Sequence, residues 1–124
     1  MLHQILRFGS VGLLATGVHT GIAFGAVHLG ISVLVANTVG FAAAFVVGFL
    51  GHHCFTFRSA TTAAAQRLRR YCLLSLTSFV AGQTCLAFLT SWAGITDTAA
   101  LLITFALIAG SNFLLARHWA FAHV

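Results

Sequence analysis

Residues 8 to 27 read FGSVGLLATGVHTGIAFGAV, a run of twenty residues without a formal charge. A helix of about 20 apolar residues spans the roughly 30 Å hydrocarbon core of a bilayer. Three further apolar runs follow, so we expect membrane spans at about 8–28, 33–57, 71–93 and 99–121. A span must satisfy its backbone hydrogen bonds internally, and four strands of this length cannot close a barrel. The sequence therefore predicts an all-α, polytopic membrane protein with four transmembrane helices.

The composition of the whole chain favours the same class. Of the 124 residues, 60% are hydrophobic and 6% are charged, whereas a soluble domain has about 25% charged residues. This length leaves room for a single transmembrane domain, residues 1–124. The three cysteines lie in or beside apolar runs, and we interpret them as small apolar residues rather than disulfide partners.

Charges are divided unevenly between the two ends of the predicted helices. The arginines lie at the N-terminus, between the second and third spans, or at the end of the fourth: Arg7, Arg58, Arg67, Arg69, Arg70 and Arg117. The one acidic residue, Asp97, lies between the third and fourth spans. We interpret the connection from Arg58 to Arg70 as a short flexible linker followed by a basic collar. Positively charged connections stay on the cytoplasmic side of a membrane. We therefore expect both termini in the cytoplasm and a multi-pass protein of the cell inner (cytoplasmic) membrane.

The two halves of the chain resemble each other. Corresponding residues, 63 or 64 positions apart, are Arg7 and Arg70, Phe49 and Phe113, Phe55 and Trp119, and Phe57 and Phe121. Each half contains an even number of spans, so we interpret them as two parallel two-helix repeats. The alternative is chance similarity between apolar helices.

The predicted cytoplasmic helix ends combine cations with aromatic residues. Arginine presents a planar fork that matches phosphate oxygens, and aromatic rings favour the membrane interface. The predicted lipid-phosphate site consists of Arg117, Asn112, Arg7, Arg70 and His53, and the predicted interfacial aromatic residues are Trp119, Phe121, Phe55 and Phe57. The alternative is that Arg117 only extends to the interface and Trp119 only anchors the helix. Nucleic acid is not an expected partner, because anionic lipid lies nearer to these cations.

Four polar residues inside the spans require partners: His19, Asn37, Gln83 and Asn112. Hydrogen bonds between helices are one account, and a polar track through the bundle is the other. We prefer the first for all except Asn112, for which both stay open. Gly17, Gly21 and Gly25 share one face of the first span, where they permit close helix packing, either within the chain or between subunits. A bundle this small encloses little lumen, which favours a homo-oligomer.

No catalytic residue, cofactor or metal site is predicted, so we do not expect an enzyme. Asp97 is the only carboxylate, which excludes paired acid and base chemistry, and the chain has no phosphate-binding loop with a lysine. The adjacent residues His52 and His53 would point about 100° apart on a helix, which is poor for joint metal binding. We expect both near the cytoplasmic interface instead, as polar anchors or titratable anion contacts. A proton-coupled exporter would need a carboxylate inside a span, and the predicted spans contain none.

The chain resembles the GtrA-like (GtrA/DPMS) family of small four-helix membrane proteins. An opening Arg-Phe-x-x-Val-Gly pattern is matched by Arg7, Phe8, Val11 and Gly12. An Asn-Phe-Leu-x-x-Arg-x-Trp-x-Phe pattern ends the fourth span, at Asn112, Phe113, Leu114, Arg117, Trp119 and Phe121. The second span departs from it, with Gly48 for asparagine, His53 for arginine and Phe55 for tryptophan.

This resemblance implies translocation (flipping) of a polyprenyl-phosphate-linked sugar for cell-envelope polysaccharide synthesis or glycosylation. The implied partners are that lipid, membrane lipids and a glycosyltransferase. The alternative is a non-transporting membrane adaptor that recruits or stabilises the glycosyltransferase. Histidine is charged only part of the time near neutral pH, so we expect the phosphate nearer Arg117 than His53.

Overall fold

The computed structural model describes residues 2–56, 61–115 and 118–119, and the side chain at position 4 is not described. These residues form four α-helices: α1 (Leu2–His28), α2 (Val33–Gly51), α3 (Thr62–Ser91) and α4 (Asp97–Leu115). A short π-helix, η1 (His52–Thr56), continues α2. All four α-helices are long and apolar enough to cross a membrane. No strand occurs in the described ranges, which confirms the prediction of an all-α, four-span protein.

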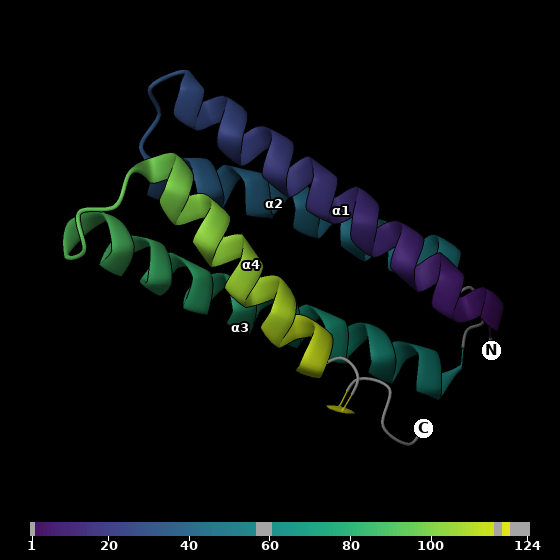
Figure 1. The fold of residues 1–124 in the computed structure, drawn as a ribbon. Coiled ribbons are helices and arrows are strands. Elements are labelled where there is room, and N and C mark those ends of the chain that lie inside the picture. Colours follow the sequence, from purple (N-terminus) through teal and green to yellow (C-terminus); the bar gives the residue numbers. More distant parts are fainter. Residues whose placement is uncertain (1, 57–60, 116–117, 120–124) are drawn as a thin grey trace.

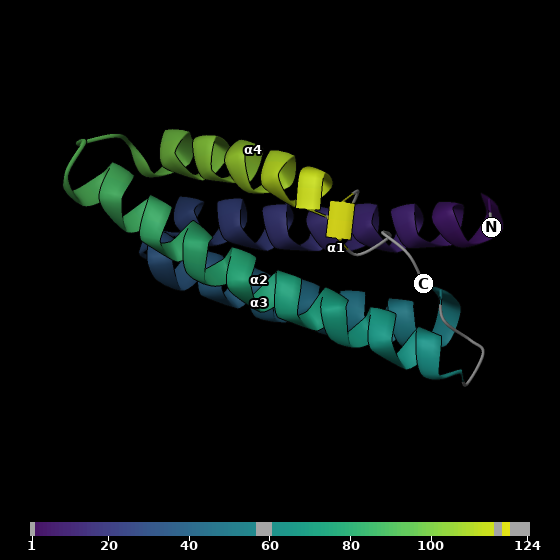
Figure 2. The same cartoon turned by 90° about the horizontal axis from the view of Figure 1, so that it is seen from below.

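The four helices lie side by side, as Figure 1 and, turned by 90°, Figure 2 show. The α1–α2 and α3–α4 turns lie together at one end of the bundle, which we call the turn end. The first residues of α1 and α3 lie toward the opposite end, which we call the arginine end because Arg7, Arg67, Arg69 and Arg70 belong to these segments. Asp97 begins α4 at the turn end. The membrane orientation and the repeat arrangement stay predictions.

Two helices begin earlier than the apolar runs suggested. The first was expected from about residue 8 and begins at Leu2, and the third was expected from about residue 71 and begins at Thr62. Thr61 caps α3, since its hydroxyl accepts a hydrogen bond from the Ala64 amide at 3.2 Å. Alanine, glutamine and arginine favour helix, so α3 forms where we had expected a flexible linker followed by a basic collar. Apolar content marks where a helix enters lipid, and not where its hydrogen bonding starts.

The turn between α1 and α2 explains why α1 ends at His28. Gly30 has a φ of 83°, a left-handed conformation that glycine adopts without steric cost. The Gly30 amide donates to Val27 O at 3.0 Å and the Ile31 amide to Ala26 O at 3.0 Å, which is the pattern of a Schellman motif. Gly94 also has a positive φ, of 65°, in the α3–α4 turn. Each hairpin is therefore closed by a glycine.

The closest helix contact is between α1 and α2, at Gly40. A Cβ atom built there would lie 2.8 Å from His19 O and 3.3 Å from Ala23 N, so the two backbones almost touch. The opposite side of α1 carries Gly17, Gly21 and Gly25, which are exposed and have nothing within 4 Å of their added Cβ positions. The alternative in which this ridge packs within the chain is therefore wrong. Instead, α1 turns the face with Val11, Ala15, His19 and Ala23 toward α2.

The hydrophobic core lies at the turn end of the bundle. Its buried members come from all four helices: Ala23, Val33, Leu86, Ala100 and Leu101. Phe24, Val27, Leu89, Ile95 and Phe105 pack around them. Leu86 and Leu101 are both 0% exposed, so this end is closed by direct side-chain packing. The rest of the bundle, toward the arginine end, is less tightly filled and contains the cavity described below.

Candidate functional site

Arg7 and Arg70 make equivalent contacts in the two halves of the chain. The Arg7 guanidinium lies over the Phe55 ring, 5.0 Å from its centroid, and donates to Phe55 O at 3.4 Å. The Arg70 guanidinium lies 5.6 Å from the Trp119 ring centroid and donates to Trp119 O at 3.4 Å. The internal repeat in the sequence pairs these same residues, Arg7 with Arg70 and Phe55 with Trp119. Each backbone contact is long, exposed and uses one of five N–H donors, which leaves most of each fork available to an anion.

The remaining predicted phosphate-site and interfacial residues fall into different surroundings. His53 is exposed and its ring lies parallel to that of Phe49, at 6.0 Å. Phe55 and Trp119 are 43% and 44% exposed, respectively. Arg117, Phe57 and Phe121 lie outside the described residues. The predicted phosphate site therefore stays a prediction, with Arg7 and Arg70 as its described cations.

The neighbouring histidine, His52, is buried between the helix ends. It is 1% exposed, stacks on Phe8 at 4.6 Å and meets the Tyr71 ring edge-on at 4.4 Å. Its Nδ1 lies 3.1 Å from the Thr56 hydroxyl. We had expected His52 at the interface beside His53. The sequence did contain a signal, since the buried positions of α2 at 36, 40, 44 and 48 continue in steps of four to 52 and 56.

A chain of side-chain hydrogen bonds crosses the middle of the bundle. His19 Nε2 lies 2.8 Å from Asn37 Oδ1, and Asn37 Nδ2 donates to Gln83 Oε1 at 2.8 Å. Gln83 Nε2 donates in turn to Leu34 O and to the Thr38 hydroxyl. Because Oδ1 only accepts, His19 Nε2 is the donor. Asn37 is 3% exposed, so this chain joins α1, α2 and α3 by interhelical bonds, as we had preferred for these residues.

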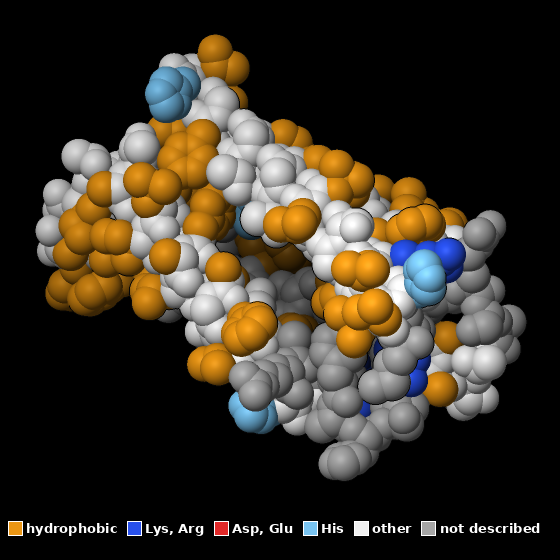
Figure 3. Space-filling view, turned by 45° about the vertical axis from the view of Figure 1, so that its right-hand side comes forward, with side chains coloured by type: hydrophobic (Ala, Val, Ile, Leu, Met, Phe, Trp, Pro, Cys, Tyr) orange, Lys and Arg blue, Asp and Glu red, His pale blue; other side chains and the backbone are white. Residues whose placement is uncertain are grey.

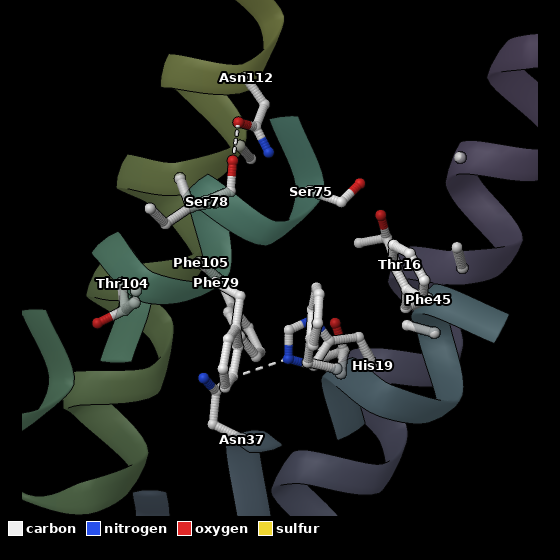
Figure 4. Close-up of a pocket in the computed structure, with 18 of the residues that line it drawn as sticks. Thr16, His19, Asn37, Phe45, Ser75, Ser78, Phe79, Thr104, Phe105 and Asn112 are labelled. Carbon is white, nitrogen blue, oxygen red and sulfur yellow. Dashed lines mark hydrogen bonds between the residues drawn. The ribbon is translucent and has the colours of Figure 1, made fainter. Parts of the chain in front are cut away.

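Asn112 is bonded to α3. The Ser78 hydroxyl donates to Asn112 Oδ1 at 2.6 Å, which joins α3 to α4. Among the described residues, this bond leaves both N–H groups of the Asn112 side-chain amide available as donors. Figure 4 shows this pair above the rings of Phe79 and Phe105. Asn112 therefore fits both alternatives that the sequence left open. It forms an interhelical hydrogen bond, and it also lines a cavity that contains other polar side chains.

The cavity has a volume of about 230 Å³ and is half open to the outside of the bundle. Figure 3 shows a hollow between the helices on one face of the molecule. Its polar lining residues are Thr16, His19, Thr20, Asn37, Tyr71, Ser75, Ser78, Thr104 and Asn112, and its aromatic ones include Phe41, Phe45, Phe79 and Phe105. Phe41 and Phe79 stack at 4.4 Å, and His19 meets Phe105 edge-on at 4.8 Å. No arginine or acidic residue is among the described lining residues.

The sequence analysis named three polar residues of this cavity, His19, Asn37 and Asn112, but did not predict that they line one cavity. The lining residues come from four helices, and the face that each helix presents inward depends on packing against the other three. Among the described residues, no group of three histidine, cysteine or acidic side chains is placed to hold a metal ion. The arrangement offers neutral hydrogen-bonding groups and aromatic faces inside the bundle, with arginines at one end.

Comparison with protein-family models gives one match, described as the GtrA/DPMS transmembrane domain, over residues 7–121. No curated protein and no solved structure matches the chain. The matched range begins at the arginine of the opening pattern and ends at the last aromatic residue of the closing one, so it covers α1 from Arg7 onward and the whole of α2, α3 and α4. This protein therefore belongs to the GtrA/DPMS transmembrane family, and it is a multi-pass membrane protein of a kind consistent with glycoconjugate synthesis.

Proposed function

We propose that the protein translocates a polyprenyl-phosphate-linked sugar across the cytoplasmic membrane. The observation that carries this proposal is the asymmetry of the bundle. Toward the arginine end, the helices surround an open cavity with apolar walls and several polar side chains, and at the turn end they are closed by Leu86 and Leu101. A flippase must pass a polar head group across the membrane while the lipid tail stays in the bilayer. A cavity that is open to the outside of the bundle suits this task.

The proposed contacts with the substrate follow from its chemistry. Arg7 and Arg70, together with Arg117 and His53, would hold the phosphate at the interface, where guanidinium groups bind phosphate oxygens in pairs. The isoprenoid chain would lie against the many exposed leucine, valine and phenylalanine side chains on the outside of the bundle. No catalytic step is required, and family members are generally non-catalytic membrane proteins.

Flipping in sealed liposomes tests the proposal directly. The probe is a short-chain polyprenyl phosphate carrying radiolabelled glucose, and the measurement is the rate at which the label becomes protected inside the vesicles. The wild-type protein should accelerate this rate over that of empty liposomes. Replacing Arg7 and Arg70 together by alanine should slow it by at least about tenfold, because charge-assisted hydrogen bonds contribute about 1.5–3 kcal/mol each. Arg69→Ala, at an exposed position on α3, is the matched control. Absence of acceleration by folded wild-type protein would refute the proposal.

The second candidate is a membrane adaptor that binds a glycosyltransferase. The early start of α3 favours it, because Arg67 and Arg69 lie on a capped helix rather than on a flexible linker. An ordered basic segment at the arginine end is suited to docking a protein. In that case, replacing Arg67 and Arg69 by alanine should abolish co-purification of an enzyme that transfers sugar to polyprenyl phosphate, and the wild-type protein should not flip the probe.

A further inference from the structure

The cavity begins close to the arginines and extends to the middle of the bundle. Tyr71, which lines it, directly follows Arg70, and Gly12 lies five residues beyond Arg7, about 7.5 Å along a helix. From Tyr71 to Gly82, the lining of α3 extends over about 16 Å. A group that is covalently attached to a phosphate held by the arginines would therefore reach the mouth of this cavity.

Hydroxyl groups inside and outside the cavity are satisfied in different ways. Five hydroxyls in the spans donate to the carbonyl four residues earlier in their own helix, and none of the five lines the cavity: Ser10, Thr38, Thr77, Thr84 and Thr90. Thr16 and Thr20 line the cavity, and within the part of the chain that the structure describes their hydroxyls make no hydrogen bond to protein. Figure 4 shows the Thr16 and Ser75 hydroxyls directed toward each other. A helical threonine can readily bond its own backbone, so these hydroxyls, of which that of Thr16 belongs to an exposed residue, are available to a polar occupant.

The lining restricts the chemistry of that occupant. An anion is disfavoured, because no arginine or lysine is among the described lining residues, His19 Nε2 already donates to Asn37, and a buried, unpaired charge is costly. A hydrocarbon chain is disfavoured, because it would leave the Asn112 amide and the threonine hydroxyls without partners. A sugar ring satisfies both conditions, since its hydroxyls donate and accept hydrogen bonds while its C–H faces pack on aromatic rings. Phe41, Phe79 and Phe105 supply such rings.

The size of the cavity restricts the occupant further. Its volume of about 230 Å³ lies below the roughly 300–1,000 Å³ that is usual for small-molecule pockets. This space accommodates one sugar ring with its hydroxyls, and it is too small for an extended oligosaccharide. Pockets that orient a ligand typically combine apolar walls with a few polar groups, which is the composition of this lining.

We propose that this cavity is a carbohydrate subsite that takes a single neutral monosaccharide head group, with Asn112 and Thr16 among its hydrogen-bonding residues. The inference rests on the proposed function, since it assumes that the sugar is carried on a polyprenyl phosphate. It assigns Asn112 to the sugar rather than to the phosphate, and it leaves the phosphate with the arginines.

Lipid binding by protein in nanodiscs separates this subsite from the phosphate site. The two probes are a short-chain polyprenyl phosphate and the same lipid carrying glucose. The wild-type protein should bind the glucose-bearing lipid more tightly, by about tenfold, as two or three neutral hydrogen bonds provide. Thr16→Val and Asn112→Leu should each weaken binding of the glucose-bearing lipid by about three- to tenfold, and should leave binding of the sugar-free lipid unchanged. Arg70→Ala should weaken binding of both lipids.

Thr84→Val is the matched control, because the Thr84 hydroxyl donates to Val80 O and lies outside the cavity. It should change neither affinity. Equal binding of the two lipids by the wild-type protein would overturn the proposal, as would an equal loss for both lipids in Thr16→Val. If Asn112→Leu fails to fold, the nearly isosteric Thr16→Val decides alone. A protein that prefers the glucose-bearing lipid but does not flip it would retain the subsite and refute only translocation.

Discussion

Gly40→Ala tests whether α1 and α2 pack as closely as the structure shows. The added methyl group would lie 2.8 Å from His19 O and 2.9 Å from His19 Cδ2, about 0.6 Å short of ordinary contact, which begins at 3.4 Å. The obstructing oxygen and Ala23 N are backbone atoms, so a rotamer change cannot relieve the clash and α1 must move away. Overpacking of this kind costs about 1–3 kcal/mol.

Two further effects accompany this change. Moving α1 lengthens the 2.8 Å contact between His19 and Asn37, and an interhelical hydrogen bond in a membrane protein contributes about 0.6 kcal/mol on average. Alanine is favoured over glycine inside a helix by about 0.5–1 kcal/mol, which offsets part of the loss. We expect a net destabilisation of about 1–2 kcal/mol, measured as the free energy of unfolding in a mixed-micelle titration with sodium dodecyl sulfate and followed by circular dichroism.

Gly21→Ala is the matched control on the facing helix. Gly21 is exposed and has nothing within 4 Å of its added Cβ, so within a single chain only the helix propensity changes, and the monomeric protein should gain up to about 0.5–1 kcal/mol. Both substitutions add one methyl group to a helical glycine, but Gly40→Ala should lower the free energy of unfolding and Gly21→Ala should raise it. If Gly40→Ala is as stable as Gly21→Ala, the α1–α2 contact is not as close as described and the packing argument fails.

The remaining predictions concern single contacts elsewhere in the bundle. Gly48→Ala should destabilise the protein, because the new methyl group would overlap the Tyr71 hydroxyl, and Tyr71→Phe should restore part of the loss in the double variant; additive effects in the same unfolding titration would contradict this coupling. Asn37→Leu removes the bonds to α1 and α3 and leaves Gln83 without its donor, so it should cost about 1–2 kcal/mol, and unchanged stability would show that these bonds do not hold the helices. Leu86→Ala, at a fully buried position, should cost about 2–5 kcal/mol, and a loss below about 1 kcal/mol would refute a packed core at the turn end.

Several features of the fold could be predicted because they depend on one helix at a time. The long uncharged run beginning at Phe8 can only be accommodated in lipid as a helix. The contrast between arginines such as Arg7 and Arg70 and the single acid Asp97 separated the two ends of the bundle, and the structure brings those arginines to one end. The repeat paired Phe55 with Trp119, and in the structure each of these rings contacts the arginine of its own half, a contact that the sequence did not predict. The presence of partners for Asn37 also followed from the cost of an unsatisfied amide in lipid.

Other features depend on how helices pack and were beyond the sequence. Helix α1 has small residues on two faces, and the sequence did not decide whether Gly21 or Ala15 would face α2. Close backbone approach at Gly40 decided it. The same packing of α1 on α2 buries His52 and leaves the adjacent His53 exposed.

By itself, the sequence therefore determined that the chain forms four spans, that the described arginines Arg7, Arg67, Arg69 and Arg70 lie toward one end and that polar side chains lie within the spans. These properties follow from the cost of placing charges and unpaired backbone groups in hydrocarbon, which each segment meets alone. Only the tertiary structure decided which faces meet, because packing is a property of pairs of helices. That packing closes the turn end around Leu86 and Leu101 and leaves Thr16, Ser78 and Asn112 around a common cavity.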